Sequence, residues 1–303
     1  MMPAIVIEKL SKTYQGKRRQ QVTALKSLDL TVAPGEVFGF LGPNGAGKST
    51  AIKVLVNQIK PSSGVARIFG ESADSPRARH RIGYLPENPA FYDFLTAQEY
   101  LDLVGRCHGM SPAIIRQESV RVLSLLDLDD AARRPIRGYS KGMVQRLGLA
   151  QALLHSPNLY ILDEPMSGLD PVGRALVKEI MLELKKQGKT VFFSTHVIAD
   201  VEAVCDRVGI VSTGELRADN AVSDIIAAGI DGYLVRLVGV PPETLWSYRT
   251  EPTLDCTTLF VPREKFNFVL RQLDQARCSI QLIDPHRRSL EDFFLKTIKQ
   301  DNT

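Results

Sequence analysis

The chain has 303 residues, of which 44% are hydrophobic and 24% charged, and its formal net charge at pH 7 is +4. These values are typical of a soluble globular protein with room for two domains. The charge is compatible with an anionic membrane surface but too small to favour nucleic acid, and the apolar runs are too short to span a bilayer.

The first part of the chain alternates short apolar strands with helices. Leu28, Leu30 and Val32 alternate with polar residues, which predicts a half-buried antiparallel strand. The apolar runs at 36–42, 158–165 and 190–195 predict buried strands separated by helices. Such a pattern indicates a largely parallel sheet with helices on its faces. We therefore predict one α/β domain over residues 1–224, with a helical subdomain at about 86–155.

Residues 225–303 have a different pattern of apolar residues, which predicts a small α/β accessory domain. Strands are expected at 233–240 and 253–262, with a helix entered at Pro241 and Pro242. Phe266, Val269, Leu270 and Leu273 recur at helical spacing and predict an amphipathic helix. A strand at 279–283, a turn at Asp284-Pro285 and a final helix from Ser289 complete this prediction.

Four cysteines are scattered along the chain with no metal-ligand spacing: Cys107, Cys205, Cys256 and Cys278. We expect them to be reduced, mostly buried thiols. The N-terminus has no basic segment followed by an apolar one, so we expect no signal peptide and a chain that stays in the cytosol.

The strongest motif, "GPNGAGKST", follows an apolar strand and opens a helix. Its glycines let backbone N–H groups cradle phosphates, Lys48 reaches the β and γ oxygens, and the Ser49 hydroxyl can hold Mg²⁺. The predicted nucleotide-binding residues of this loop are Gly42, Pro43, Asn44, Gly45, Ala46, Gly47, Lys48, Ser49 and Thr50.

Acidic and imidazole side chains end two other predicted strands. Asp163 ends the run "YILD", where it can hold Mg²⁺, and Glu164 follows at once. A carboxylate beside the γ-phosphate can orient and partly deprotonate the attacking water. His196 ends "FFSTH", where its imidazole can contact the γ-phosphate. A lone histidine is more often structural, and an acidic pair is only moderately specific because solvated strand ends are often acidic. The phosphate loop nevertheless favours a catalytic interpretation of Glu164 and His196.

A second helix start also presents backbone N–H groups to an anion. In "YSKGMVQRLGLAQAL" the turn at Ser140 to Gly142 opens a helical run. Unsatisfied amides and the helix dipole favour negative charge there. The alternative is that Ser140 merely caps an ordinary amphipathic helix.

Together these motifs resemble the ATP-binding cassette (ABC) family over about the first 220 residues. "GPNGAGKST" is similar to the Walker A loop, and "YILDEP" to Walker B with Glu164 as the catalytic glutamate. "SGLD" resembles the D-loop and implies that Asp170 lies at a dimer seam. The resemblance also implies that His196 is the switch histidine and that Tyr14 stacks on adenine.

"YSKGM" occupies the place of the family's signature, which implies a role for the second helix start. In this family two cassettes pack head to tail, so Ser140 and Gly142 are expected to complete the γ-phosphate site of a partner. Lys141 and Met143 depart from the usual signature residues. Glu87 stands where the family's Q-loop has glutamine, so an additional carboxylate is expected near Mg²⁺ as a candidate ligand.

The resemblance implies a P-loop ATPase that uses ATP and Mg²⁺ and pairs with a second ABC ATPase subunit. A homodimer is expected, and a pair of non-identical cassettes is the open alternative. The resemblance also implies a transmembrane permease on a separate chain, gripped near residues 87–100, and a position on the cytoplasmic face of the inner or plasma membrane. "SLEDFFLKTI" resembles the closing helix of exporter cassettes, though a helix that packs on its own domain explains it equally well.

Two alternatives remain open at this point. One is a soluble ABC ATPase that acts on nucleic acid or ribosomes, which the single cassette and low charge disfavour, so no nucleic acid is expected. The other is a degenerate cassette that serves as a regulatory binding module, which Glu87 and Lys141 favour slightly.

Overall fold

The computed structural model describes residues 2–15, 21–228, 230–250, 257–287 and 290–299. The chain divides into two units, Met1–Asn220 and Ala221–Thr303. The predicted boundary after residue 224 falls inside the helix α8 (Val222–Ala228), which belongs to the second unit.

The first unit contains a four-stranded antiparallel sheet. Its strand order is β2-β1-β4-β5, with β1 (Ile5–Gln15), β2 (Gln21–Val32), β4 (Ser63–Ile68) and β5 (Glu71–Ser72). Leu28, Leu30 and Val32 of β2 are buried, and β2 runs antiparallel to β1, which confirms the strand predicted from their alternation.

A six-stranded sheet forms the centre of the first unit, in the order β10-β9-β3-β8-β7-β6. The strands are β3 (Val37–Leu41), β6 (Ile82–Leu85), β7 (Leu159–Asp163), β8 (Thr190–Thr195), β9 (Arg207–Ser212) and β10 (Glu215–Ala221). Every residue of β3, β7 and β8 is buried, because parallel strands are covered on both faces. β3 pairs in parallel with β8, and β8 with β7, so their carboxyl ends meet at one edge of the sheet.

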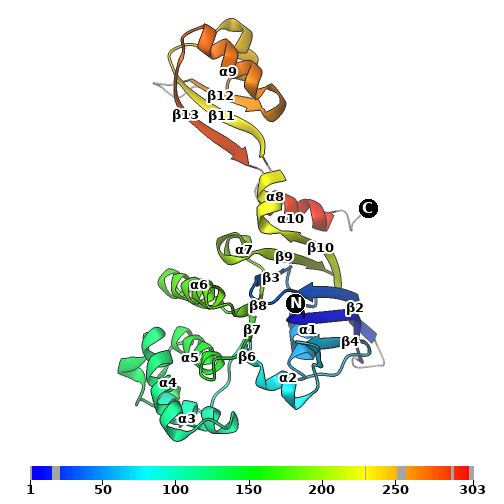
Figure 1. The fold of residues 1–303 in the computed structure, drawn as a ribbon, viewed down its shortest axis with the longest axis vertical. Helices are drawn as coiled ribbons and strands as arrows, with labels where there is room; N and C mark the ends of the chain where they lie inside the picture. The colour runs from blue at the N-terminus through cyan, green and yellow to red at the C-terminus, as the bar shows by residue number, and fades with distance from the viewer. Residues whose placement is uncertain (1, 16–20, 229, 251–256, 288–289, 300–303) are drawn as a thin grey trace. The chain divides into compact units, whose positions relative to one another are not determined.

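Helices complete the first unit (Figure 1). Four belong to the α/β part: α1 (Lys48–Leu55), α2 (Pro76–His80), α6 (Pro171–Lys186) and α7 (Ile198–Val204). Between β6 and β7 the chain forms α3 (Ala97–Cys107), α4 (Pro112–Leu125), the short 3₁₀ turns η2 (Asp129–Ala131) and η3 (Ile136–Gly138), and α5 (Lys141–Leu153). Thr96 and Glu99 form a reciprocal capping box at the start of α3, and Ser111 caps α4 ahead of Pro112. The fold is thus the predicted α/β core with antiparallel N-terminal strands and a helical part.

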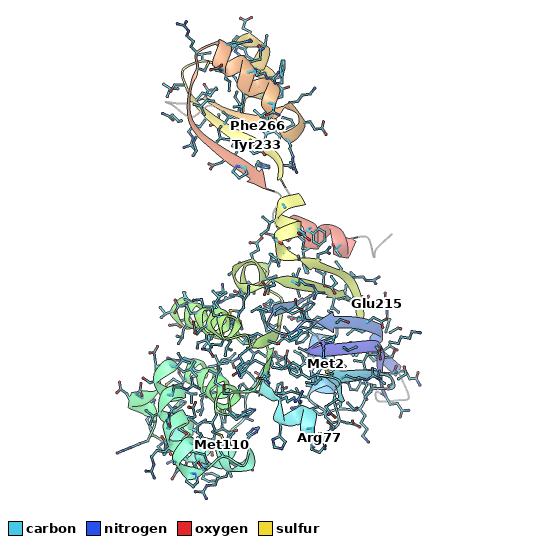
Figure 2. The ribbon with its side chains drawn as sticks, in the orientation of Figure 1. Met2, Arg77, Met110, Glu215, Tyr233 and Phe266 are labelled. Carbon is cyan, nitrogen blue, oxygen red and sulfur yellow. The ribbon has the colours of Figure 1, made fainter. Side chains whose placement is uncertain are left out.

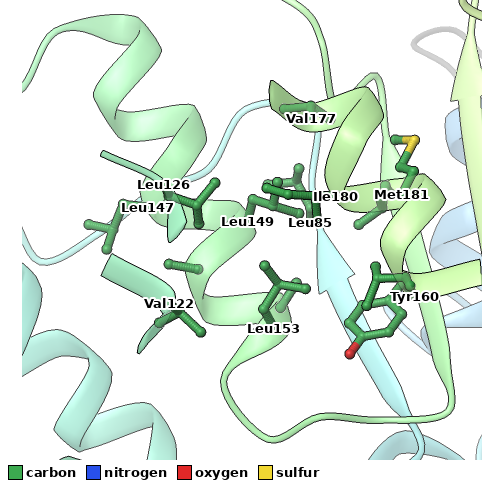
Figure 3. Packing of buried hydrophobic residues seen from close by; sticks show 14 of the residues in the cluster. Leu85, Val122, Leu126, Leu147, Leu149, Leu153, Tyr160, Val177, Ile180 and Met181 are labelled. Carbon is green, nitrogen blue, oxygen red and sulfur yellow. The ribbon is translucent and has the colours of Figure 1, made fainter. Parts of the chain in front are cut away.

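Two apolar clusters hold this unit together. In the first, side chains of α4, α5 and α6 pack with those of β6 and β7, as Figure 3 shows for Val122, Leu149, Tyr160 and Ile180. In the second, Phe38, Phe40 and Phe192 pack between the central sheet, α1 and the antiparallel sheet. The phosphate loop and the strand ends therefore rest on a rigid, close-packed base.

The second unit contains a three-stranded antiparallel sheet in the order β12-β11-β13. Its elements are α8, β11 (Ile230–Val238), η4 (Glu243–Tyr248), β12 (Thr257–Pro262), η5 (Arg263–Lys265), α9 (Phe266–Gln275), β13 (Ser279–Arg287) and α10 (Leu290–Lys299). Val269 and Leu273 of α9 pack on Val235 and Leu259, and the rings of Tyr233 and Phe266 stack with centroids 3.9 Å apart (Figure 2).

Some local predictions for this unit need correction. The turn expected at Asp284-Pro285 is wrong, because β13 continues through both residues to Arg287. β13 is an edge strand, where a proline can leave its missing N–H on the unpaired side. The helix expected after Pro241 and Pro242 is the 3₁₀ turn η4. The predicted strand residues 253–256 and the predicted helix start at Ser289 lie outside the described residues.

The prediction of mostly buried thiols is wrong for Cys107, which is exposed at the last position of α3. Cys205 and Cys278 are partly buried, and Cys256 lies outside the described residues. Within the described ranges, none of the helices combines the length and apolar character that crossing a bilayer demands.

The aromatic cluster gives a test of this packing. Phe192 is 0% exposed, and its ring centroid lies 5.8 Å from that of Phe38 and 5.4 Å from that of Phe40. We expect Phe192→Ala to cost about 3–5 kcal/mol of unfolding free energy by leaving a cavity. The melting temperature of the first unit should fall by roughly 10 °C in a calorimetric scan. Phe94→Ala is the matched control, since Phe94 is 67% exposed; an equal shift in both variants would contradict the prediction.

Candidate active site

The loop from Gly42 to Gly47 joins the carboxyl end of β3 to α1. Gly47 stands at the N-cap of α1 with φ +104°, and a Cβ there would lie 2.5 Å from the Ala24 carbonyl oxygen. A Cβ on Gly42 would lie 2.3 Å from the Val211 carbonyl oxygen. Gly45 also has a positive φ, of +81°, but its hypothetical Cβ meets no atom within 4 Å. Packing therefore requires two of the glycines, while the third bends the loop beside open space.

Lys48 is the first residue of α1, at the end of this loop, and is only 6% exposed. Its Nζ donates to the carbonyl oxygens of Gly42 at 2.7 Å and Pro43 at 3.2 Å. The same Nζ lies 3.5 Å from Glu164 Oε1. The ammonium is thus held by its own loop at a fixed point, where it can bind an anion.

Asp163 ends β7 and is buried beneath Ser49. Its Oδ1 accepts hydrogen bonds from Ser194 Oγ at 2.6 Å and Ser49 Oγ at 3.2 Å. Burial raises the pKa of the Asp163 carboxyl above its usual value, and the two hydroxyl hydrogen bonds offset part of that rise. A cation bound at this carboxylate would favour its ionised form.

The Ser49 hydroxyl and the Asp163 carboxylate suit Mg²⁺, which accepts oxygen ligands and often uses one or two carboxylates with water and substrate phosphates. Among the described residues, no group of three or more His, Cys, Asp or Glu side chains is placed to hold a metal. A metal at this site would therefore draw most of its ligands from nucleotide and water.

Glu164 turns away from the strand axis immediately after Asp163. Its φ is +48°, in the left-handed region that is unfavourable for a non-glycine residue. The Glu164 N–H donates to Ser194 Oγ at 2.9 Å, and its carbonyl oxygen accepts from Gln145 Nε2 at 3.4 Å. These contacts hold the turn, which places the carboxylate between Lys48 and His196.

His196 follows β8 and contacts that carboxylate directly. Its Nδ1 lies 3.0 Å from Glu164 Oε2 and 3.1 Å from Oε1. The imidazole side chain is 50% exposed, so packing alone does not fix its position. The pair can act as a carboxylate base with an orienting imidazole.

A cavity of about 640 Å³ brings most of the predicted residues together. Its lining includes Tyr14, Asn44, Gly45, Ala46, Gly47, Lys48, Ser49, Thr50, Glu87, Glu164 and His196. Gly42, Pro43 and Asp163 are not among the lining residues but contact Lys48 or Ser49 through the hydrogen bonds above. The Tyr14 hydroxyl is 3.5 Å from Thr50 Oγ1. Glu87 is exposed, and its coordinating role stays a prediction.

Three other predicted residues, Ser140, Gly142 and Asp170, also lie outside the lining of this cavity. Ser140 caps α5, its Oγ accepting from the Met143 N–H at 3.3 Å, and Gly142 follows within the helix. Asp170 caps α6, accepting from the Gly173 N–H at 2.8 Å. Lys141 lies against Gly168, where a Cβ would be 2.7 Å from Lys141 Cε. The signature and the "SGLD" segment thus contact each other within one chain.

The sequence did not reveal several residues that support this site. Ser194 binds both Asp163 and the Glu164 backbone, Gln145 binds the carbonyl oxygens of Glu164 and Pro165, and Ser167 lines the cavity. The one available signal was the position of Ser194 near the end of a buried strand. Its use required knowing that β8 pairs with β7 in a register that puts Ser194 opposite Asp163.

A lysine-bearing phosphate loop with strand-end carboxylates defines a P-loop nucleotide hydrolase. Residues 25–167 match the family model described as ABC transporter. Over 299 residues the chain is 39% identical to an uncharacterized ABC transporter ATP-binding protein, sll0415, of Synechocystis, covering 96% of this chain and 83% of that protein. The chain therefore belongs to the ABC transporter ATP-binding proteins.

Two of the similar proteins have names or structures that indicate a function. The chain is 37% identical over 246 residues to the Nod factor export ATP-binding protein I of Paraburkholderia xenovorans, covering 80% of this chain and 79% of that protein. The dimeric post-hydrolysis structure of the ATP-binding cassette MJ0796 with ADP and Pi matches with a TM-score of 0.67 and 25% identity, over 72% of this chain and 98% of that one. The predictions of an ABC ATPase fold, ATP binding and ATPase activity are confirmed at the level of the family.

Lys48 gives the sharpest test of the phosphate loop. We expect Lys48→Ala to raise the Kd for ATP at least about 100-fold, because it removes a buried cation and leaves Glu164 without it. Isothermal titration with ATP measures the change. Lys53→Ala is the matched control, since Lys53 is exposed on the same helix. Tight ATP binding by Lys48→Ala would contradict the assignment.

Proposed function

We propose that this chain dimerises head to tail around ATP and Mg²⁺ and powers a separate transmembrane permease, as the ATP-binding subunit of an exporter. One observation carries the dimer: Ser140 and Gly142 begin a helix outside the cavity that holds Lys48 and Glu164. A helix start with unsatisfied amides suits a phosphate, yet its own chain's cavity does not include it. A second copy supplies the missing contact.

Within one chain, Lys48 and Glu164 form the part of the site that responds to the γ-phosphate. A phosphate oxygen at Lys48 competes with Glu164 for the same ammonium, whose present separation from Oε1 is 3.5 Å. Once released from Lys48, the Glu164 carboxylate can accept a proton from the attacking water. His196, which contacts this carboxylate, would orient it.

Ser49 and Asp163 would hold Mg²⁺ between them, and the ion would neutralise charge on the β- and γ-phosphate oxygens. Tyr14, which also lines the cavity, is proposed to stack on adenine. Asp170 is proposed to lie at the seam between the two chains, close to the start of α6.

The proposed permease contact is the segment that follows Glu87. Tyr92 and Phe94 are 59% and 67% exposed, with ring centroids 6.0 Å apart. Two large exposed aromatic side chains side by side are typical of a protein interface. The name of the Nod factor export relative supports export as the direction. We therefore place this chain at the cytoplasmic face of the membrane that holds its permease.

The glutamate variant tests the dimer. We expect Glu164→Gln to bind ATP while its turnover falls at least about 100-fold, because the general base is lost. The loaded protein should then elute as a dimer in size-exclusion chromatography with ATP and Mg²⁺. A monomer at saturating ATP, with or without the permease, would contradict the proposal.

Mixing two variants tests whether the dimer is head to tail, with each site shared between two chains, or has some other arrangement. In the Glu164→Gln background, Lys48→Ala chains lack the phosphate loop lysine, and Ser140→Arg chains lack the signature contact. Neither should dimerise alone. An equimolar mixture should form a dimer with one ATP, because one site regains Lys48 from one chain and Ser140 from the other.

The membrane partner is tested by cell fractionation. We expect the wild-type chain in the membrane fraction together with a multi-spanning protein, and the double variant Tyr92→Asp, Phe94→Asp in the soluble fraction with ATP binding intact. Val120→Asp is the control, since Val120 is 58% exposed on α4. Salt-sensitive recovery with ribosomes or DNA would instead favour a soluble ABC ATPase of the nucleic-acid class.

A further inference from the structure

The carboxylate of Asp200 forms ion pairs that have no role in the reaction proposed above. Asp200 lies in the first turn of α7, four residues after His196, and is only 2% exposed. Its Oδ2 accepts from Arg174 Nη2 at 2.9 Å, and its Oδ1 lies 2.9 Å from Lys178 Nζ. Both carboxylate oxygens therefore bind cations of α6.

This contact joins the two segments that carry the site. α6 begins directly after Asp170, and Arg174 and Lys178 lie among its first eight residues. α7 begins two residues after His196. A cavity of about 170 Å³ lies between the segments, and its lining includes Ser167, His196 and Asp200. The ion pairs of Asp200 with Arg174 and Lys178 link the two segments beside this space.

His196 depends on such a link. Its side chain is 50% exposed, so its position relative to Glu164 follows from the backbone that carries it. That backbone is held by the Val197 N–H, which donates to Thr195 Oγ1 at 3.0 Å, and by the Asp200 N–H, which donates to the Val197 carbonyl oxygen at 3.2 Å. The second bond turns the chain into α7, and α7 is fixed to α6 through Asp200.

We propose that Asp200 is a positioning residue for ATP hydrolysis. Its carboxylate attaches α7, and with it the backbone at His196, to α6, the helix that follows Asp170. This inference rests on the proposed roles of Glu164 and His196. A displacement of His196 at the start of α7 changes its contact with Glu164, while the phosphate loop, built on β3 and α1, keeps its own hydrogen bonds. Asp200 should therefore affect turnover and leave ATP binding intact.

Asp200→Asn keeps the shape of the side chain and removes its charge. We expect kcat to fall about tenfold or more, since small displacements of a reacting group cost this much. The Kd for ATP and the fraction of chains that bind ATP should stay within about twofold of wild type. Asp200→Glu, which keeps the charge, should recover part of the lost kcat.

Asp206→Asn is the matched control. Asp206 also pairs with a lysine of α6, Lys185, and its Oδ2 accepts from the Val37 N–H at 3.0 Å. Lys185 lies in the last turn of α6, at the far end from Asp170. The same substitution there removes a carboxylate that pairs with the same helix, α6, and kcat should stay within about twofold of wild type.

The role of Asp200 is overturned if Asp200→Asn keeps wild-type kcat. It is also overturned if kcat and the fraction of chains that bind ATP fall by the same factor, because the loss of turnover then reflects only a loss of folded protein. Should Asp200→Asn not fold, Arg174→Gln decides, because the Arg174 side chain is 36% exposed and Lys178 still pairs with Asp200. A lower kcat with unchanged ATP affinity supports the role, and an unchanged kcat overturns it. Glu164→Gln in the same assay separates the two proposals: wild-type turnover there would refute the proposed function itself.

Discussion

The hydrogen bonds to the buried carboxylate of Asp163 are the constraint on which the site depends. One oxygen atom, Oδ1, accepts from Ser49 at the start of α1 and from Ser194 in β8. It thereby ties together the ends of three strands of the central sheet, β3, β7 and β8. Because a buried charge without partners is costly, the two hydroxyls are required in these places, and they fix the distances between the strand ends.

The rest of the site follows from that tie and from the strand order β3-β8-β7. Ser194 also accepts the Glu164 N–H, which holds the left-handed turn that carries the glutamate out of its strand. The carboxylate then meets Lys48 from the loop after β3 and His196 from the end of β8. Residues more than a hundred positions apart form one site because parallel strands present their carboxyl ends at the same edge.

The sequence predicts those parts of this arrangement whose causes are local. The glycines of the phosphate loop and the buried strands β3, β7 and β8 are visible within short windows, and the structure contains them. The contacts of Asp163 with Ser194 and of Asp200 with Arg174 are not visible, because they depend on register and on which helices pack together. The error at Pro285 has the same origin, since a proline is tolerated in a strand only if that strand lies at an edge, and sheet order is a tertiary property.

Charge gives a physical reason why the proposed site should be divided between two chains. Within one chain, Glu164 already balances Lys48, so a triphosphate adds negative charge that the lysine alone does not offset. Mg²⁺ at Ser49 and Asp163 offsets part of it, and the amides at the start of a partner's α5 would offset more. Lys141 is the first residue of α5 and would add a cation at that helix start. Attraction between the chains would then depend on the γ-phosphate and weaken after its release, which makes closure a consequence of the nucleotide's charge.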